Sequence, residues 1–111
     1  MNVNFKGFGE NVLTFVAGPN LNEVGVPVSM YADGTVNVCS DGDAFCGVCV
    51  GVRDGYAAVQ VSGYVELAAE SKISVGYQNL VCSGGKLAKV NESGREYLVV
   101  ESTENTVGFI L

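Results

Sequence analysis

The sequence predicts an all-β protein, a small antiparallel β-barrel or β-sandwich that forms a single domain over residues 1–111. Turn-forming residues recur about every 8 to 12 residues, a spacing typical of both architectures. Short runs of apolar and β-branched residues lie between the turns. The chain contains 15 Gly and 48% hydrophobic residues but only 16% charged residues, a composition that favours a folded domain over a disordered chain.

Taken in chain order, these runs predict strands over residues 12–17, 26–31, 35–39, 73–75, 78–82, 86–90, 97–101 and 106–111, around a central hairpin within 45–67. Pro27 cannot donate a ladder hydrogen bond, so its strand should begin there or lie at a sheet edge. Only Glu-Leu-Ala-Ala-Glu-Ser-Lys at 66–72 favours helix, and it is long enough for one short turn at most.

The central hairpin is predicted from Asp54-Gly55, a preferred dipeptide for a two-residue type I′ turn. If these residues form the turn, Arg53 faces Tyr56, and the pairing continues as Val52 with Ala57, Val50 with Val59 and Val48 with Val61. Side chains alternate between the faces of a strand, so one face of the hairpin should be aliphatic. The other face should be flat and made of small residues, suited to packing against another sheet or subunit: Gly47, Cys49, Gly51, Ala58, Gln60 and Ser62.

Two segments about fifty residues apart resemble each other. Tyr31-Ala-Asp-Gly-Thr-Val and Cys82-Ser-Gly-Gly-Lys-Leu are each followed by a polar turn and an apolar strand. The similarity has two explanations, an internal repeat or two unrelated hairpins that share turn chemistry. We favour shared turn chemistry, since two copies are too few to indicate a solenoid.

Charge and hydropathy exclude several classes of function. The net charge is −6, and the six Lys and Arg residues are scattered singly, which predicts no nucleic-acid binding. No segment approaches the roughly 18 apolar residues of a membrane-spanning helix, so we expect no membrane association. The first residues lack the apolar run of a signal peptide, which favours synthesis in the cytoplasm without secretion by that route.

Cys39, Cys46, Cys49 and Cys82 are the candidate metal ligands, and Cys46 and Cys49 have CxxC spacing. Residues three apart in a regular strand point to opposite faces, which argues against a shared ligand site. We therefore predict buried, reduced cysteines and no metal or cofactor. A four-cysteine zinc site is the alternative.

No catalytic residues can be assigned from the sequence. The chain has no His, which removes the usual general base and the Ser-His-Asp and Cys-His systems. Asp41 and Asp43 could belong to a calcium loop, but the full ligand pattern is missing, and turn formation explains both aspartates more simply. We expect a protein that is not an enzyme.

From about Gly25 onward the chain resembles small head-decoration (capsid cement) proteins of tailed phages and prophages. The resembling segments are Gly-Val-Pro-Val at 25–28, Asp-Gly-Thr-Val at 33–36, Phe-Cys-Gly-Val at 45–48, Val-Ser-Gly-Tyr-Val-Glu-Leu at 61–67 and Val-Gly-Tyr-Gln at 75–78. The resemblance implies a compact barrel or β-tulip-like domain that binds assembled major capsid protein and stabilises the head. It also implies a homo-oligomer, with a trimer favoured, on the virion surface. No catalytic residue comes with it.

Both chain ends are candidate contact segments. Val3 and Phe5 alternate with polar residues, so residues 1–11 could form an extended arm that pairs with the capsid or a sister subunit, or a strand inside the monomer. Val107, Phe109 and Leu111 also alternate, and we expect them to pair within the monomer. A small carbohydrate-binding or adhesin-type β module remains the alternative function, although the chain has no Trp.

Overall fold

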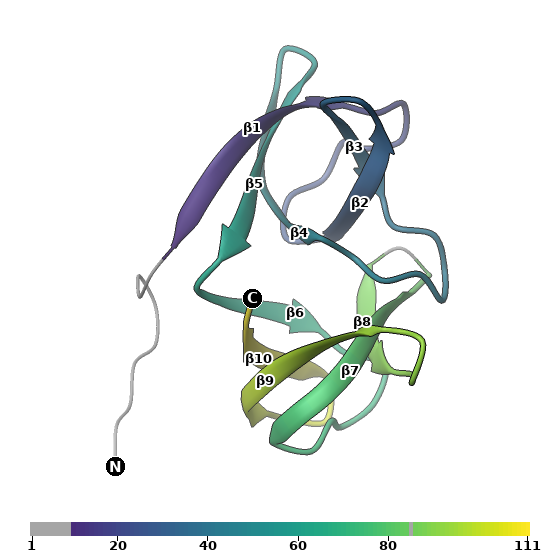
Figure 1. The fold of residues 1–111 in the computed structure, drawn as a ribbon, viewed down its shortest axis with the longest axis vertical. Helices are drawn as coiled ribbons and strands as arrows, with labels where there is room; N and C mark the ends of the chain where they lie inside the picture. The colour runs from purple at the N-terminus through teal and green to yellow at the C-terminus, as the bar shows by residue number, and fades with distance from the viewer. Residues whose placement is uncertain (1–9, 85) are drawn as a thin grey trace.

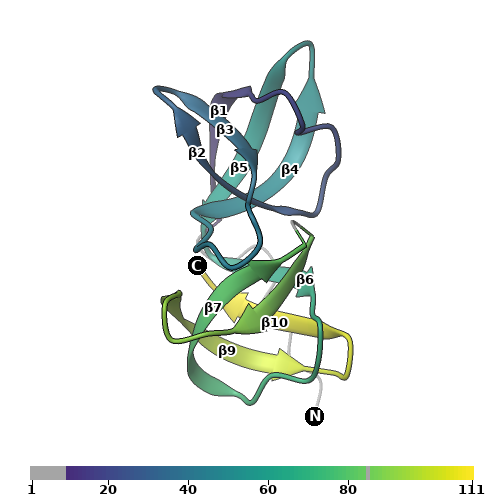
Figure 2. The ribbon, with the colours of Figure 1, turned by 90° about the vertical axis from the view of Figure 1, so that its right-hand side faces the viewer.

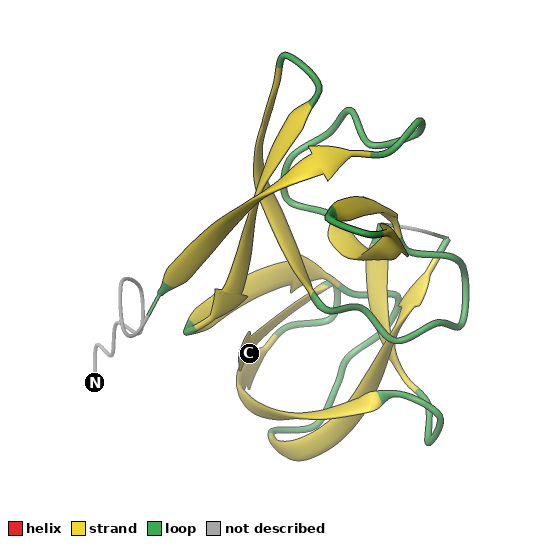
Figure 3. Cartoon of the chain, turned by 45° about the horizontal axis from the view of Figure 1, so that its top comes forward, coloured by secondary structure: helices red, strands yellow, loops and turns green. Residues whose placement is uncertain are grey.

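The structure is a computed structural model that describes residues 10–84 and 86–111, and the described residues form strands and loops without a helix (Figures 1 and 3). The all-β prediction is confirmed. The strands of the N-terminal half are β1 (Asn11–Ala17), β2 (Pro27–Ala32), β3 (Thr35–Val38), β4 (Gly47–Arg53) and β5 (Tyr56–Ser62). Those of the C-terminal half are β6 (Tyr64–Ala68), β7 (Gly76–Ser83), β8 (Leu87–Val90), β9 (Arg95–Ser102) and β10 (Thr106–Ile110).

The N-terminal half is a closed barrel with the strand order β1-β3-β2-β4-β5. Its pairs are antiparallel except for β1 and β3, which run parallel and pair Val16 with Thr35 and Ala17 with Val36. The barrel encloses its own apolar cluster, which includes Val28, Val36, Cys49, Ala57 and Val59. The second half is a five-stranded sheet with the order β6-β10-β9-β7-β8 below the barrel (Figures 1 and 2).

The two halves share one topology. If each strand of the order β3-β2-β4-β5-β1 is replaced by the strand five places later, the result is β8-β7-β9-β10-β6, which is the second sheet. The parallel contact recurs as well, because Ala69 bridges Ala88 just as Ala17 pairs with Val36. The similarity between the segments at 31 and 82 therefore reflects an internal structural repeat, and the preference for shared turn chemistry alone was wrong.

A β-bulge also recurs in both halves. In β4 the pairing with β5 skips Val50, since Cys49 faces Val59 and Gly51 faces Ala58. In β9 the pairing with β10 skips Val100 in the same way, because Val99 faces Phe109 and Glu101 faces Gly108. An extra residue on one strand reverses the side-chain alternation beyond it. The bulges thus place Cys49 and Val99 in the cores of their halves.

The bulge corrects the predicted hairpin register. Asp54 and Gly55 form the turn with positive φ values of 53° and 81°, and the first two predicted pairs, Arg53 with Tyr56 and Val52 with Ala57, are confirmed. Beyond the bulge, Val48 faces Gln60 rather than Val61, and Val50 is exposed rather than paired with Val59. The predicted aliphatic face is therefore broken at Val50.

Gly63 separates the two halves. Its φ of 87° lies in the left-handed region, and the chain turns there from β5 into β6. Residues 45–67 were predicted to form one hairpin, so the separate strand β6 was not predicted. Residues 66–68, where a helical turn was considered, belong to β6, and residues 73–75 lie outside the strands.

Phe45, from the segment before β4, joins the halves. Its side chain packs in the core of the C-terminal half, where its ring stacks on Tyr97 with centroids 5.3 Å apart and meets Phe109 at 5.9 Å. The Tyr97 hydroxyl donates a 2.8 Å hydrogen bond to the Phe45 carbonyl. Val107 and Phe109 are also buried in this core, which confirms that the C-terminal strand pairs within the monomer.

Candidate functional site

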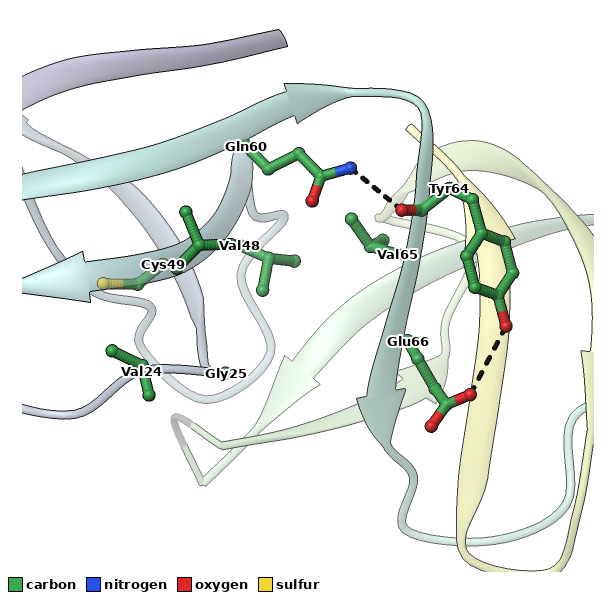
Figure 4. Close-up of a pocket in the computed structure, with 9 residues that line it drawn as sticks. Val24, Gly25, Val48, Cys49, Gln60, Tyr64, Val65 and Glu66 are labelled. Carbon is green, nitrogen blue, oxygen red and sulfur yellow. Dashed lines mark hydrogen bonds between the residues drawn. The ribbon is translucent and has the colours of Figure 1, made fainter. Parts of the chain in front are cut away.

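An apolar groove with a volume of about 290 Å³ lies where the two halves meet (Figure 4). The N-terminal half contributes the segment before β2, the start of β4 and the end of β5, and the C-terminal half contributes the start of β6. Its lining residues are Val24, Gly25, Val48, Cys49, Val50, Gln60, Tyr64, Val65 and Glu66. Val24 and Val50 are exposed, so the groove has an apolar rim.

Gln60 fixes the geometry of the groove. Its side chain is buried, and its Nε2 donates to the carbonyls of Tyr64 at 2.9 Å and Ser62 at 3.0 Å (Figure 4). These two bonds span the turn at Gly63 and hold the start of β6 against the end of β5. A buried amide with both donor positions used in this way orders the backbone around it.

The predicted small-residue face does not form one exposed surface. Cys49 has no exposed area and faces the barrel core because of the bulge at Val50. Gly47 and Gln60 are buried, so a partner protein could not contact either residue.

The rest of that face is partly exposed. Gly51 and Ala58 line a second apolar hollow, of about 350 Å³, at β4 and β5, and Ser62 is half-buried at the end of β5. Whether these three residues contact a partner stays a prediction. Val3 and Phe5 lie outside the described residues.

The cysteines divide between the two cores. Cys46 and Cys49 pack with the barrel, whereas Cys39 and Cys82 belong to the core of the C-terminal half. The prediction that Cys46 and Cys49 point to opposite faces of one strand was wrong, because Cys46 precedes β4 and packs against the same barrel cluster as Cys49. Among the described residues no three His, Cys, Asp or Glu side chains gather as a metal site would require.

Cys39 and Cys82 lie close together. The thiols of both donate to the Ser40 carbonyl, at 3.7 Å from Cys39 and 2.7 Å from Cys82. Burial, together with the neighbouring Cys82 thiol, raises the pKa of Cys39. Burial also raises the pKa of Cys46 and of Cys49. All four cysteines are free thiols; Cys39, Cys49 and Cys82 are buried as predicted, whereas Cys46 is half-buried.

A tyrosine between two carboxylates lies beside the groove. The Tyr64 hydroxyl donates to Glu101 of β9 and lies 3.4 Å from Oε2 of Glu66 on β6. The ring lies over Gly108, where any side chain would collide with it. Burial is the main cause that raises the pKa of Tyr64, and its hydrogen bond to Glu101 adds to the shift. This carboxylate pair is not evident from the sequence, since Glu66 and Glu101 come from strands far apart in the chain.

Apolar side chains are also exposed outside the groove. Val12 and Leu13 of β1 are 49% and 51% exposed, although they lie on opposite faces of the strand. Figure 3 shows that the start of β1 extends beyond the other strands of the barrel. In the C-terminal half, Tyr77 is 69% exposed.

No helix in the described part of the chain is both long and apolar enough to cross a membrane. Comparison with known proteins adds no family assignment: no protein-family model matches the chain, and no curated protein shows significant sequence similarity to it.

Proposed function

We propose that the protein is a non-enzymatic structural protein of the phage head-decoration type, which binds assembled major capsid protein on the virion surface and stabilises the shell. The observation that carries the proposal is the contrast between interior and surface. Inside, every buried side-chain nitrogen and oxygen of the described residues has a hydrogen-bond partner. Outside, apolar side chains of both halves are exposed.

Exposed apolar surface of this kind is typical of proteins that act through contact with a larger partner. Apart from Val24 and Val75, the exposed large apolar residues of the described chain lie on strands, which present a fixed array of side chains at little entropic cost. Gln60, which donates to the Tyr64 carbonyl, and Phe45, which stacks on Tyr97, hold the two halves as one unit. A domain of this type can brace the protein subunits beneath it, and the sequence resemblance to capsid cement proteins points to the same role.

The test uses cognate phage capsids that lack decoration. Purified protein is mixed with expanded capsids, and co-sedimentation and the melting temperature of the shell are measured. We expect saturable binding and a higher shell melting temperature. A protein that stays in the supernatant and leaves the shell melting unchanged would contradict the proposal.

A carbohydrate-binding module is the second candidate. A hollow of about 210 Å³ beside Tyr64 is lined by two carboxylates and three hydroxyl side chains, and these groups can hydrogen-bond to sugar hydroxyls. Its lining residues are Glu66, Glu101, Ser102, Thr103, Thr106 and Gly108. Glycan-array binding that is lost in Glu101→Gln would favour this candidate over capsid binding.

A further inference from the structure

Within one chain, the N-terminal half covers the start of β6 in the C-terminal half. Val48 and Gln60 are paired neighbours on β4 and β5, and both are buried where β6 begins. Val48 shares a core cluster with Val65, and Gln60 donates to the Tyr64 carbonyl. The end of the N-terminal half therefore closes over the start of the first strand of the C-terminal half.

Strand pairing identifies the counterparts of these residues. In the N-terminal half, Gln60 of β5 pairs with Val48 on one side and with Val12 on the other. In the C-terminal half, Ile110 of β10 pairs in the same way with Leu98 and with Tyr64. Leu98 and Ile110 are thus the counterparts of Val48 and Gln60. By the same pairing, Val12 and Leu13 are the counterparts of Tyr64 and Val65.

The counterparts differ from the originals in burial. Tyr77 pairs with Leu98 as Pro27 pairs with Val48, so Tyr77 is the counterpart of Pro27. In the N-terminal half, Pro27, Val48 and Gln60 are all buried. In the C-terminal half, Tyr77 is exposed, and Leu98 and Ile110 are partly exposed. We call Tyr77, Leu98 and Ile110 the C-terminal row. Val65, which shares a core cluster with Val48, is 5% exposed, and Tyr64, whose ring lies over Gly108 of its own half, is equally buried. Their counterparts Val12 and Leu13, which we call the β1 tip, are about half exposed. Each half of the in-chain contact thus has an exposed apolar counterpart on the same molecule.

We propose that copies of this chain associate head to tail, with the C-terminal row of one copy covering the β1 tip of the next. The contact repeats between copies the relation that joins the two halves within one copy. The residues of the C-terminal row and of the β1 tip are themselves uncharged, so the proposed contact places no carboxylate at its centre. The inference does not depend on capsid binding.

The contact between copies lacks two features of the in-chain contact. Ile110 stands where Gln60 supplies its hydrogen bonds, and the turn before β9 spans only residues 91–94, without an aromatic anchor equivalent to Phe45. Association between copies should therefore be reversible and dependent on concentration. A head-to-tail contact generates a ring if the rotation closes and a filament if it does not.

The test measures the mass of the full-length protein by sedimentation equilibrium over a range of concentrations. We expect the weight-average mass of the wild type to rise well above that of one chain. Leu13→Asp in the β1 tip and Tyr77→Asp in the C-terminal row should each remain one chain at the same concentrations. Met30→Asp and Val90→Asp are matched controls, since both side chains are exposed apolar residues outside the two surfaces, and these variants should assemble like the wild type.

Mixing the two interface variants tests the head-to-tail relation itself. Each variant keeps one intact surface, so an equimolar mixture should form pairs of chains that cannot grow further. A symmetric contact, in which the same surface meets itself, would give no pairs in the mixture. Wild-type protein that is a single chain at every concentration, interface variants that assemble normally, or a mixture without pairs would each overturn the proposal. Val12→Asp replaces Leu13→Asp if the latter does not show the wild-type circular dichroism spectrum.

Discussion

Replacement of Phe45 by alanine should lower the free energy of unfolding of the whole molecule. Phe45 precedes β4 of the N-terminal half, but its side chain packs in the core of the C-terminal half. Phe45 is 2% exposed, and its ring meets those of Tyr97 and Phe109. Truncation of a buried Phe to Ala costs about 3–5 kcal/mol, to which each aromatic pair contributes about 0.5–1.5 kcal/mol. This is a large share of the roughly 5–15 kcal/mol that stabilises a typical domain.

Urea denaturation followed by circular dichroism measures the loss in the free energy of unfolding, and thermal denaturation measures the fall in melting temperature. At about 4 °C per kcal/mol for a domain of this size, the melting temperature should fall by about 12–20 °C. Tyr97→Phe is the matched control, since it keeps the ring and removes only the hydrogen bond to the Phe45 carbonyl, at a cost of about 1–3 kcal/mol. A loss below about 1.5 kcal/mol in Phe45→Ala would refute the role of Phe45 as the joint between the halves.

Three further predictions test other parts of the structure. Gly63→Ala should destabilise the protein by about 1–2 kcal/mol in urea denaturation, because alanine is strained at a φ of 87°, and an unchanged midpoint would contradict this role of Gly63. Tyr64 has a raised pKa in the folded state, so the unfolded chain loses this proton first as pH rises; the stability that Tyr64 contributes should be constant below about pH 10 and be lost above it, so the free energy of unfolding should fall less steeply above pH 10 in Tyr64→Phe than in the wild type. Cys39, Cys49 and Cys82 are buried with no more than 1% exposed area, so a thiol reagent should label them only in denaturant, and rapid labelling of the native protein would show that their cores open.

The sequence predicted local features well and long-range pairing less well. The turn at Asp54-Gly55 was correct because both residues tolerate positive φ, and that requirement is local. The bulge at Val50 was missed because nothing in a run of alternating Val, Gly and Cys marks which residue is unpaired. This single extra residue moved Cys49 from the predicted contact face into the barrel core.

The repeat and the candidate site depended on pairing that the sequence does not display. The two halves share turns at similar spacings, but their equivalence rests on the parallel bridge of Ala69 and Ala88 and on the second bulge at Val100. The groove likewise joins residues of β4, β5 and β6 across the turn at Gly63. Gly63 resembles many other glycines of this chain, so the end of one half and the start of the next were read as one hairpin.

Binding to undecorated capsids tests the central claim most directly. Titration of the protein onto cognate expanded capsids, with the bound fraction measured by sedimentation and the shell by calorimetry, should give saturation at a fixed number of copies per capsid subunit and a higher shell melting temperature. Absence of bound protein at concentrations that would saturate a micromolar site, with an unchanged shell melting temperature, would contradict the claim.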